Sequence, residues 1–185
     1  RRAEWKSPAP RYTAGVLHAF QRQSNAITLA NFSGIVNAIA MIRVNNCGLF
    51  LNPQYLTFKM YTNHSGPTLL KTSVKCDTFA APDYEEGRPQ AKSKIPYLDV
   101  SATTDKEGKT VYMAVINLHA DKEIRTKLSF DRWDFTPDVK TIELYHPNYM
   151  AENTLEQPEN ITIKENSLAG ISNPFEYTFK PHSVT

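Results

Sequence analysis

Cysteine is scarce in this chain of 185 residues, which contains only Cys47 and Cys76. Neither belongs to a Cys-x-x-Cys pair or to a set of cysteines and histidines with the spacing of a zinc site. We therefore expect no metal, and no motif indicates an organic cofactor. The two thiols can pair only if the fold brings their α-carbons within about 7 Å, and two buried free thiols are the equal alternative.

An excess of charge of either sign is also missing. The chain has 21 Lys and Arg against 19 Asp and Glu, which gives a formal net charge of +2. No basic run alternates with aromatic residues in the manner of a phosphate-binding surface. We therefore expect no nucleic acid as a partner.

Long apolar runs are absent as well. The longest stretches, IVNAIAMI and VYMAVINL, are far shorter than the roughly 20 residues that span a bilayer, and neither has the basic flank of a secretory signal. We expect no membrane contact. Three glycosylation sequons, which begin at Asn31, Asn63 and Asn160, favour a secreted or extracellular glycoprotein.

Helical spacing dominates the first part of the chain. Apolar residues in YTAGVLHAFQRQSN recur every three or four positions after Thr13, so the spacing predicts a helix over 12–25 with Thr13 as its cap. Ile27 and Leu29 then alternate with small or polar residues before Asn31, which predicts a short buried strand.

The run LNPQYLTFKMYTNHSG at 51–66 has the clearest helix signals in the sequence. Asn52 suits the N-cap, Pro53 suits the first helical position, and Gly66 suits the C-terminal stop. A strand between two helices needs sheet neighbours on either side. We therefore expect an upstream polypeptide to complete this part of the fold.

Beyond Gly66 the apolar period changes to two and turn residues separate the runs. Seven strands are predicted, in TLLKTSVKC, PYLDVSATTD, KTVYMAVINLH, IRTKLSF, VKTIELYH, ENITIKE and FEYTFKP. Seven short strands without an intervening helix are typical of an antiparallel sandwich. The stretch AAPDYEEGRPQAKSKIP is predicted to be a long surface loop, and residues 1–66 and 67–185 are expected to be two different units.

Five segments, in order along nearly the whole chain, resemble one known family. They are LHAFQRQSNAITLANFSGIVNAIAMI, LNPQYLTFKMYTNHSG, PYLDVSATTDKEGKTVYMAVINLH, AENTLEQPENITI and PHSVT. Together they resemble the C-terminal region of the α-L-arabinofuranosidases of glycoside hydrolase family 51. The resemblance implies a (β/α)8 barrel with two catalytic glutamates, a jelly-roll-like β-sandwich, and cleavage with retention of configuration.

On this resemblance the chain begins within the barrel. The predicted helix around Leu17 is the seventh barrel helix, ITLAN is the eighth strand, and PQYLTFKMYTNH is the eighth helix. The fold class is then the last helix-strand-helix elements of a barrel followed by the sandwich. The second glutamate lies on the fourth strand, outside these 185 residues, so activity is expected to require the upstream barrel polypeptide.

The same resemblance places the catalytic nucleophile at Glu4, followed by Trp5. A retaining glycosidase uses one carboxylate to attack the anomeric carbon and another, about 5–5.5 Å away, as acid and base. Trp5 offers a flat apolar wall for a sugar. Asn31 and Asn37 are candidate substrate ligands, and the alternative for both is that they hold the transition from strand to loop.

Two positions depart from the family's pattern. Lys6 stands where the family has Asn after Glu-Trp, and it adds a positive charge beside Glu4. Gly34 stands where the family has a Gln that contacts the innermost sugar, and glycine has no side chain to donate a hydrogen bond. The sugar and linkage that are cleaved, and the formation of a homo-oligomer, are left open.

A second hypothesis makes the chain a non-catalytic carbohydrate-binding or interaction module. It requires exposed coplanar aromatic rings, for which Trp133, Phe135 and Tyr149 are the candidates. Among the other ionisable residues, His18 is interpreted as a packing histidine. Asp99 and Asp105 are interpreted as turn and edge residues without a catalytic role.

Overall fold

The computed structural model describes residues 9–37, 41–80, 94–131 and 139–185. Its helices are α1 (Ala9–Arg22) and α2 (Pro53–Asn63). Its strands are β1 (Ile42–Asn45), β2 (Gly48–Leu51), β3 (Thr68–Leu70), β4 (Thr78–Phe79), β5 (Ile95–Pro96), β6 (Leu98–Thr104), β7 (Val111–Asn117), β8 (Ile124–Leu128), β9 (Val139–Leu144), β10 (Ile163–Leu168) and β11 (Phe175–Phe179). No helix in the described ranges is long and apolar enough to cross a membrane.

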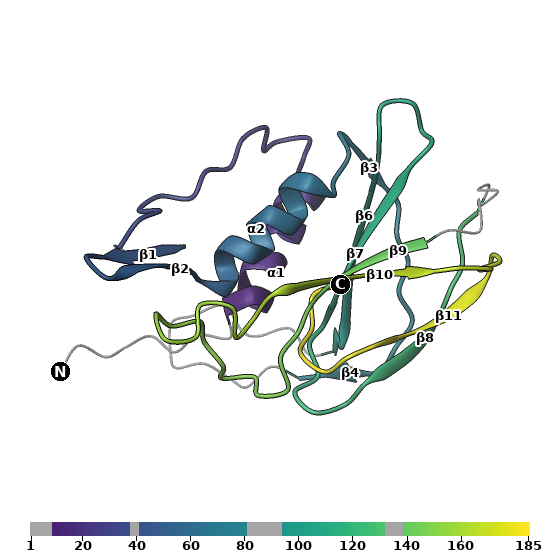
Figure 1. Cartoon of the computed structure of the whole chain (residues 1–185). Helices are drawn as coiled ribbons and strands as arrows, with labels where there is room; N and C mark the ends of the chain where they lie inside the picture. Colours follow the sequence, from purple (N-terminus) through teal and green to yellow (C-terminus); the bar gives the residue numbers. More distant parts are fainter. Residues whose placement is uncertain (1–8, 38–40, 81–93, 132–138) are drawn as a thin grey trace.

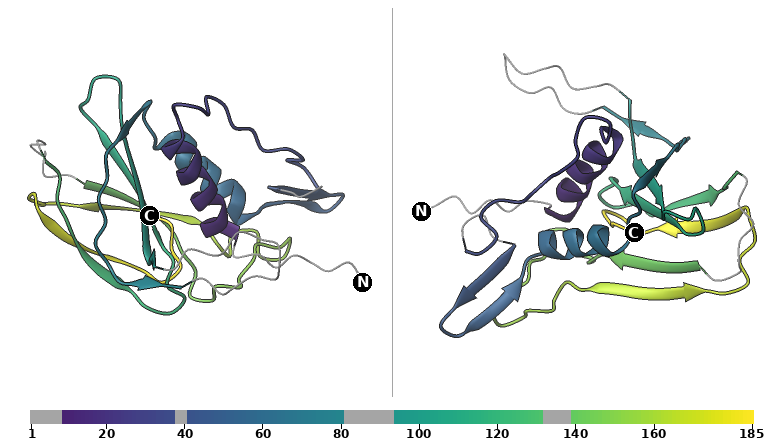
Figure 2. Two further views of the ribbon diagram at one scale, coloured as in Figure 1. Left: turned by 180° about the vertical axis from the view of Figure 1, so that it is seen from behind. Right: turned by 90° about the horizontal axis from the view of Figure 1, so that it is seen from above.

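The larger strands form an antiparallel β-sandwich, and the two helices lie against the outer side of one sheet (Figure 1). One sheet contains β10, β9, β7, β6 and β3, and the other pairs β11 with β8. Two small hairpin-like pairs, β1 with β2 and β4 with β5, lie apart from these sheets. Figure 2 shows the helix layer and the two sheets from behind and from above.

Val184 joins the two halves of the larger sheet. Its backbone bridges Ile116 of β7 on one side and Leu144 of β9 on the other. The N–H of Leu144 donates to the carbonyl of Val184 over 2.8 Å, and the N–H of Val184 donates to the carbonyl of Leu144 over 3.1 Å. Val115 and Thr185 form a further pair of backbone hydrogen bonds, which are 2.8 and 2.9 Å long. The strand order is therefore β10-β9, the segment around Val184, then β7-β6-β3, with that segment in the middle.

Strand alternation in β7 divides the core into two parts. Ile116 faces the helices, where it packs in a buried cluster with Ala14, Leu56 and Leu144. Val115, its neighbour in the chain, faces the other sheet in a second cluster. Because successive side chains point to opposite faces of a strand, one short apolar run supplies both layers. The members of the second cluster are Leu98, Val115 and Phe179.

Both predicted helices are present, but their ends differ from the prediction. α1 begins at Ala9, so Thr13 lies inside the helix and its assignment as the cap is wrong; Pro10 in the first turn is compatible with the earlier start. α2 has Asn52 at the N-cap position and Pro53 at its start, as predicted. It ends at Asn63, three residues before Gly66, with His64 as the C-cap.

Gly66 is needed for a different reason than stopping a helix. A Cβ atom at this position would lie 1.9 Å from the carbonyl oxygen of Thr104 and 2.8 Å from the backbone nitrogen of Asp105. The N–H of Gly66 also donates to the hydroxyl of Thr103 over 2.9 Å. Only glycine allows the chain after α2 to cross β6 this closely.

The predicted strand at 27–31 is wrong. Residues 27–35 are irregular, and within the described ranges this segment meets a strand only at an isolated parallel bridge between Val36 and Ile42. Leu29 leaves 76% of its surface exposed. An apolar strand needs neighbours to hydrogen-bond and to cover its faces, and the described part of the chain supplies none here.

All seven strands predicted after Gly66 have counterparts, and the antiparallel sandwich is confirmed. The strand predicted from ENITIKE lies further along, at Ile163–Leu168. β4 and β5 pair at the two ends of the predicted long loop, most of which (81–93) lies outside the described residues.

The β1–β2 hairpin was not predicted. Its strands pair in the register Ile42 with Leu51 and Val44 with Leu49. Cys47 lies exposed at its tip, and both cysteines are free thiols. Neither alternative for the cysteines holds as stated, because the thiols do not pair and Cys47 is not buried. Cys76 is half-buried, and its sulfur accepts a bond from the N–H of Leu98.

The crossing at Gly66 predicts a strong effect of one methyl group. We expect Gly66→Ala to lower the free energy of unfolding by about 1–3 kcal/mol or more, because the backbone at Thr104 must move to make room. Urea unfolding followed by circular dichroism measures it. Gly15→Ala is the matched control: nothing lies within 4 Å of its Cβ position in α1, so it should stabilise by about 0.5–1 kcal/mol. Equal stabilities of Gly66→Ala and the wild type would contradict the close crossing.

Candidate functional site

The residues proposed for catalysis lie next to α1 in the sequence. Glu4 and Trp5 precede its first residue, Ala9, and fall in 1–8, outside the described residues. Their assignment as nucleophile and sugar wall stays a prediction. Trp133 and Phe135, in 132–138, are also outside the described residues.

The two candidate asparagine ligands lie in the irregular segment that follows α1. Asn31 is exposed. The side-chain amide of Asn37 donates to the carbonyl of Val44 and accepts from its N–H, both over 2.9 Å. Asn37 is exposed, and the predicted strand before it is irregular in the structure, so this pairing ties Asn37 to β1 and does not hold a transition from strand to loop. Direct contact of either asparagine with substrate stays a prediction.

Tyr149 packs against two neighbours, although 49% of its surface stays exposed. The guanidinium carbon of Arg11 lies 5.6 Å from the centre of its ring, and the ring of His182 meets it edge-on at 6.1 Å. A sugar platform needs a flat ring open to solvent. Tyr149 is therefore better explained by its packing with Arg11 and His182 than by glycan binding.

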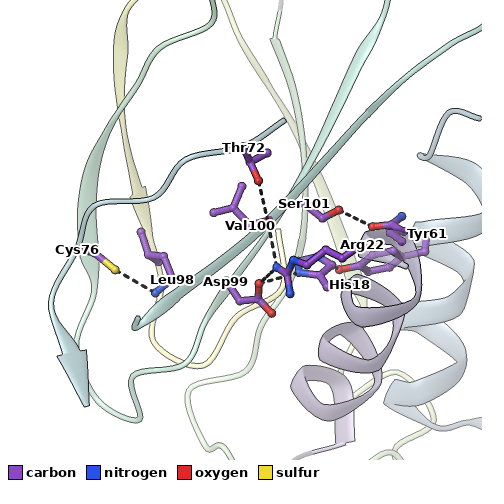
Figure 3. Close-up of polar contacts among 10 residues, drawn as sticks. His18, Arg22, Tyr61, Thr72, Cys76, Leu98, Asp99, Val100 and Ser101 are labelled. Carbon is purple, nitrogen blue, oxygen red and sulfur yellow. Dashed lines mark hydrogen bonds and ion pairs between the residues drawn. The ribbon is translucent and has the colours of Figure 1, made fainter. Parts of the chain in front are cut away.

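A buried polar contact joins the two helices to β6 (Figure 3). His18 of α1 is completely buried, and its Nε2 lies 2.6 Å from the hydroxyl of Tyr61 in α2. Its Nδ1 lies 3.4 Å from a carboxylate oxygen of Asp99 in β6. Arg22, at the end of α1, pairs with the same carboxylate and donates to the carbonyl of Val100 over 3.1 Å. We call these four residues, His18, Arg22, Tyr61 and Asp99, the His18 junction.

Weaker polar contacts extend the His18 junction along β6. The hydroxyl of Ser101 donates to the side-chain carbonyl of Gln21 over 2.6 Å. The amide nitrogen of Gln21 lies 3.4 Å from the hydroxyl of Ser65, just beyond α2. One face of α1 is therefore bonded both to the sheet and to the end of α2.

Burial and charge set the protonation states in the His18 junction. Partial burial raises the pKa of the Asp99 carboxyl, but the contacts with His18 and Arg22 lower it by more, so the net shift is downward. Burial, together with the charge of Asp99, raises the pKa of the Tyr61 phenol far above its ordinary value. The Tyr61 phenol is therefore neutral, and its hydroxyl shares a hydrogen bond with Nε2 of His18.

The His18 junction holds α1 and α2 against β6. The ring of His18 is fully buried, so a substrate cannot reach it. The interpretation of His18 as a packing histidine is confirmed by its burial. Asp99 pairs with Ile116 of β7 on one side, whereas β3 pairs only with Ala102–Thr104, so the interpretation of Asp99 as an edge residue fits its place in β6. Asp105 does lie in a turn, where its carboxylate accepts from the N–H of Lys109 over 2.7 Å.

A cavity among the described residues also lacks the groups for glycoside cleavage. It has a volume of about 530 Å³ and extends from α2 into the space between the sheets. Its lining is mostly apolar and includes Met113, Leu128 and Phe179, with Lys109 and Lys140 but no acidic residue. Cleavage needs two carboxylates, so this cavity is not the catalytic site.

The low pKa of Asp99 predicts a loss of stability in acid. The folded-state pKa is below the unfolded value of about 3.9, so the ionised carboxylate contributes its full stability above that value. The contribution disappears as the pH falls through the folded-state pKa. We expect Asp99→Asn to lower the free energy of unfolding at neutral pH by about 1–3 kcal/mol and to flatten its dependence on pH below about 4.

Chemical unfolding at a series of pH values measures this effect. Asp121→Asn, an exposed substitution in the loop after β7, is the control and should leave the profile as in the wild type. An Asp99→Asn protein with wild-type stability at every pH would show that the ionised carboxylate of Asp99 contributes nothing to the free energy of unfolding.

Two solved structures of α-L-arabinofuranosidases have the fold of this chain. The enzyme from Thermotoga petrophila RKU-1, of glycoside hydrolase family 51, superposes with a TM-score of 0.85 at 29% sequence identity. The enzyme from Thermotoga maritima, solved with arabinose, superposes with a TM-score of 0.83 at 30% identity. Each match covers 95% of this chain and 36% of the larger enzyme.

Curated relatives point to the same group of proteins. The "probable alpha-L-arabinofuranosidase C" of Aspergillus terreus is 24% identical over 174 residues, which are 91% of this chain and 32% of the relative. The "intracellular exo-alpha-L-arabinofuranosidase" of Bacteroides ovatus is 26% identical over 107 residues, 57% of this chain and 19% of the relative. The chain thus spans a third or less of these two relatives.

The expected secreted or extracellular location is wrong. The Bacteroides ovatus relative is named as an intracellular enzyme, which contradicts an assignment that was based on three sequons. Short Asn-x-Ser/Thr patterns are common by chance in chains rich in these residues, so they carried little information about location.

The family model of the α-L-arabinofuranosidase C-terminal domain matches residues 12–183. That range includes most of α1, all of α2 and all of β1 to β11, and it ends one residue before Val184. The chain belongs to the α-L-arabinofuranosidase C-terminal domain family, as the C-terminal region of a protein like the arabinofuranosidases of glycoside hydrolase family 51.

Proposed function

We propose that this chain supplies the last barrel elements and the accessory sandwich of a retaining, exo-acting glycosidase. The enzyme releases terminal α-L-arabinofuranosyl units from plant-type polysaccharides or oligosaccharides. The remainder of the barrel is the chain's principal partner, and the chain alone is inactive. Residues 1–66 belong with the barrel, and residues 67–185 form the sandwich.

The arrangement of α1, the segment after it and α2 is the observation that carries this proposal. The helices lie side by side with their N-terminal ends toward the same end of the molecule (Figures 1 and 2). The segment between them returns from the end of α1 to the β1–β2 hairpin, just before α2, as the strand of a barrel repeat does. Phe32 anchors this segment on Phe58 of α2, with ring centres 5.9 Å apart.

Exposed apolar side chains support a missing neighbour at this segment. Large apolar side chains that remain exposed in the segment after α1 include Leu29, Ile35 and Val36. Several large apolar side chains exposed on one segment are typical of an interface. The adjoining strands and helices of a barrel would cover it.

Glu4 takes the role of nucleophile in this proposal. Its carboxylate attacks the anomeric carbon and forms a glycosyl-enzyme ester, while a glutamate of the barrel protonates the leaving oxygen and then activates water. Trp5 lies beside the sugar, and the charge of Lys6 favours the ionised form of Glu4. The fourth barrel strand, with the second glutamate, must therefore lie within reach of Glu4.

Gly34 makes the sugar contact of this enzyme differ from the family's pattern. Its φ is 68°, in the left-handed region that favours glycine. A Gln at this position would be strained in the backbone seen here. The preference for arabinofuranosyl units must therefore be supplied by groups other than a Gln at position 34.

Replacement of Glu4 tests the catalytic role. In the full-length enzyme, we expect Glu4→Gln to lower kcat on an aryl α-L-arabinofuranoside by about 10⁴-fold or more while the enzyme still binds the sugar, because the amide cannot form the glycosyl ester. Added azide should restore turnover of Glu4→Ala, since a small anion can replace the lost nucleophile. With the wild-type enzyme, proton NMR of the first sugar product should show retained configuration.

Glu176→Gln is the matched control. Glu176 forms an exposed ion pair with Arg125 on the second sheet, and its amide variant should retain wild-type kcat. Full activity of Glu4→Gln would remove Glu4 from the mechanism. An inverted sugar product from the wild-type enzyme would exclude the retaining reaction.

A further inference from the structure

Asn37 binds the β1–β2 hairpin in the way that a neighbouring strand would. Its Nδ2 donates to the carbonyl of Val44 and its Oδ1 accepts from the N–H of Val44, both over 2.9 Å. Its own N–H donates to the carbonyl of Ile42 over 3.0 Å, and Arg43 donates to its carbonyl over 3.3 Å. The φ of Asn37 is 56°, a left-handed conformation that asparagine tolerates better than most residues.

The hairpin depends on such external bonds for a fixed position. An isolated two-stranded hairpin is marginal in water. At its base, the N–H of Asn52 donates to the carbonyl of Met41 over 2.9 Å, and the amide of Asn153 donates to the carbonyl of Leu51 over 2.8 Å. These bonds hold the base, whereas Asn37 holds β1 near its middle.

One face of the hairpin is apolar and open. The cross-strand pairs Ile42 with Leu51 and Val44 with Leu49 lie on that face. Val44 is 42% exposed and Leu49 is 57% exposed. Apolar side chains of this kind line binding sites for organic ligands.

The hairpin lies in the part of a barrel repeat where substrates bind. In (β/α)8 enzymes the active site is built from the loops that lead from each strand into the following helix. The hairpin is the last structure before α2, and Glu4 lies in the corresponding stretch before α1. The N-terminal ends of both helices point the same way (Figure 1). Under the proposed function, we therefore expect the hairpin and Glu4 on the same rim of the barrel.

We propose that Asn37 is a positioning residue that holds the β1–β2 hairpin at the mouth of the active site, where the hairpin contacts the sugar units beyond the terminal arabinofuranosyl group. This inference rests on the proposed function. Asn37 then affects substrate binding through the hairpin, without touching the reacting atoms. Val44 and Leu49 present an apolar surface to the C–H face of a sugar ring in the leaving group.

Asn37→Asp in the full-length enzyme tests the proposal. The substitution keeps the shape and the acceptor oxygen but places a carboxylate oxygen against the carbonyl of Val44. Two substrates are compared, an aryl α-L-arabinofuranoside and an arabino-oligosaccharide. We expect the ratio of the KM for the oligosaccharide to the KM for the aryl glycoside to rise about tenfold, with kcat on the oligosaccharide within about twofold of wild type. Leu49→Ser, which leaves the Asn37 bonds in place, should raise the same ratio.

Asn173→Asp is the matched control, because Asn173 makes the same two-point contact elsewhere. Its Nδ2 donates to the carbonyl of Phe130 over 2.6 Å, and its Oδ1 accepts from the N–H of Phe130 over 3.0 Å. This contact is in the sandwich, so the KM ratio should stay at the wild-type value even if thermal stability falls as in Asn37→Asp.

The outcomes separate this inference from the proposed function. An unchanged KM ratio in Asn37→Asp, or an equal loss on both substrates, would make Asn37 merely structural and overturn the inference, while the Glu4→Gln result still decides the catalytic role. A wild-type enzyme that cleaves neither substrate would overturn both.

Discussion

The backbone pairing of residues 183–185 with β7 and β9 is the constraint on which the rest of the fold depends. Without it, the larger sheet would be two separate pieces, β10-β9 and β7-β6-β3. Val184 is fully buried, and with Ile116 and Leu144 it forms the floor on which the helices pack. A segment that pairs on both sides satisfies the backbone groups of two strands at once. The layer of helices and the layer of strands therefore share one central element.

The helices also contact the larger sheet through polar groups, whose hydrogen bonds are more directional than apolar packing. Apolar packing sets how close α1 and α2 lie to the sheet, whereas the hydrogen bonds and ion pairs of the His18 junction set the angle and register. Buried polar groups are costly when a partner moves away. Under the proposed function, this rigidity matters because Glu4 and the hairpin are attached to the N-terminal ends of those same helices.

Sequence patterns predicted the sandwich well because alternation records which side chains face a core. Val115 and Ile116 serve opposite faces of β7, and both are buried. Alternation failed for Ile27 and Leu29, since a local pattern cannot show whether neighbouring strands are present. The hairpin was missed because Ile42 to Leu51 contains apolar residues on both sides of a short turn at Asn46 and Cys47 that lacks a strong turn dipeptide. The link between His18 and Asp99 had no signal, since polar pairing between distant residues leaves no periodicity. The order of motifs, in contrast, placed the chain in its family, and the family model matches residues 12–183.

The His18 junction also bears on how such enzymes can be recombined. If the chain were divided at Gly66, the sandwich would retain Asp99 and lose both the imidazole and the guanidinium that accompany it. A graft of strands alone would bring a half-buried carboxylate to a foreign surface without the side chains of His18 and Arg22 that contact it. The helices α1 and α2 and the sheets thus share these contacts, and a chimaera should be joined upstream of α1 rather than at the apparent border between helices and strands.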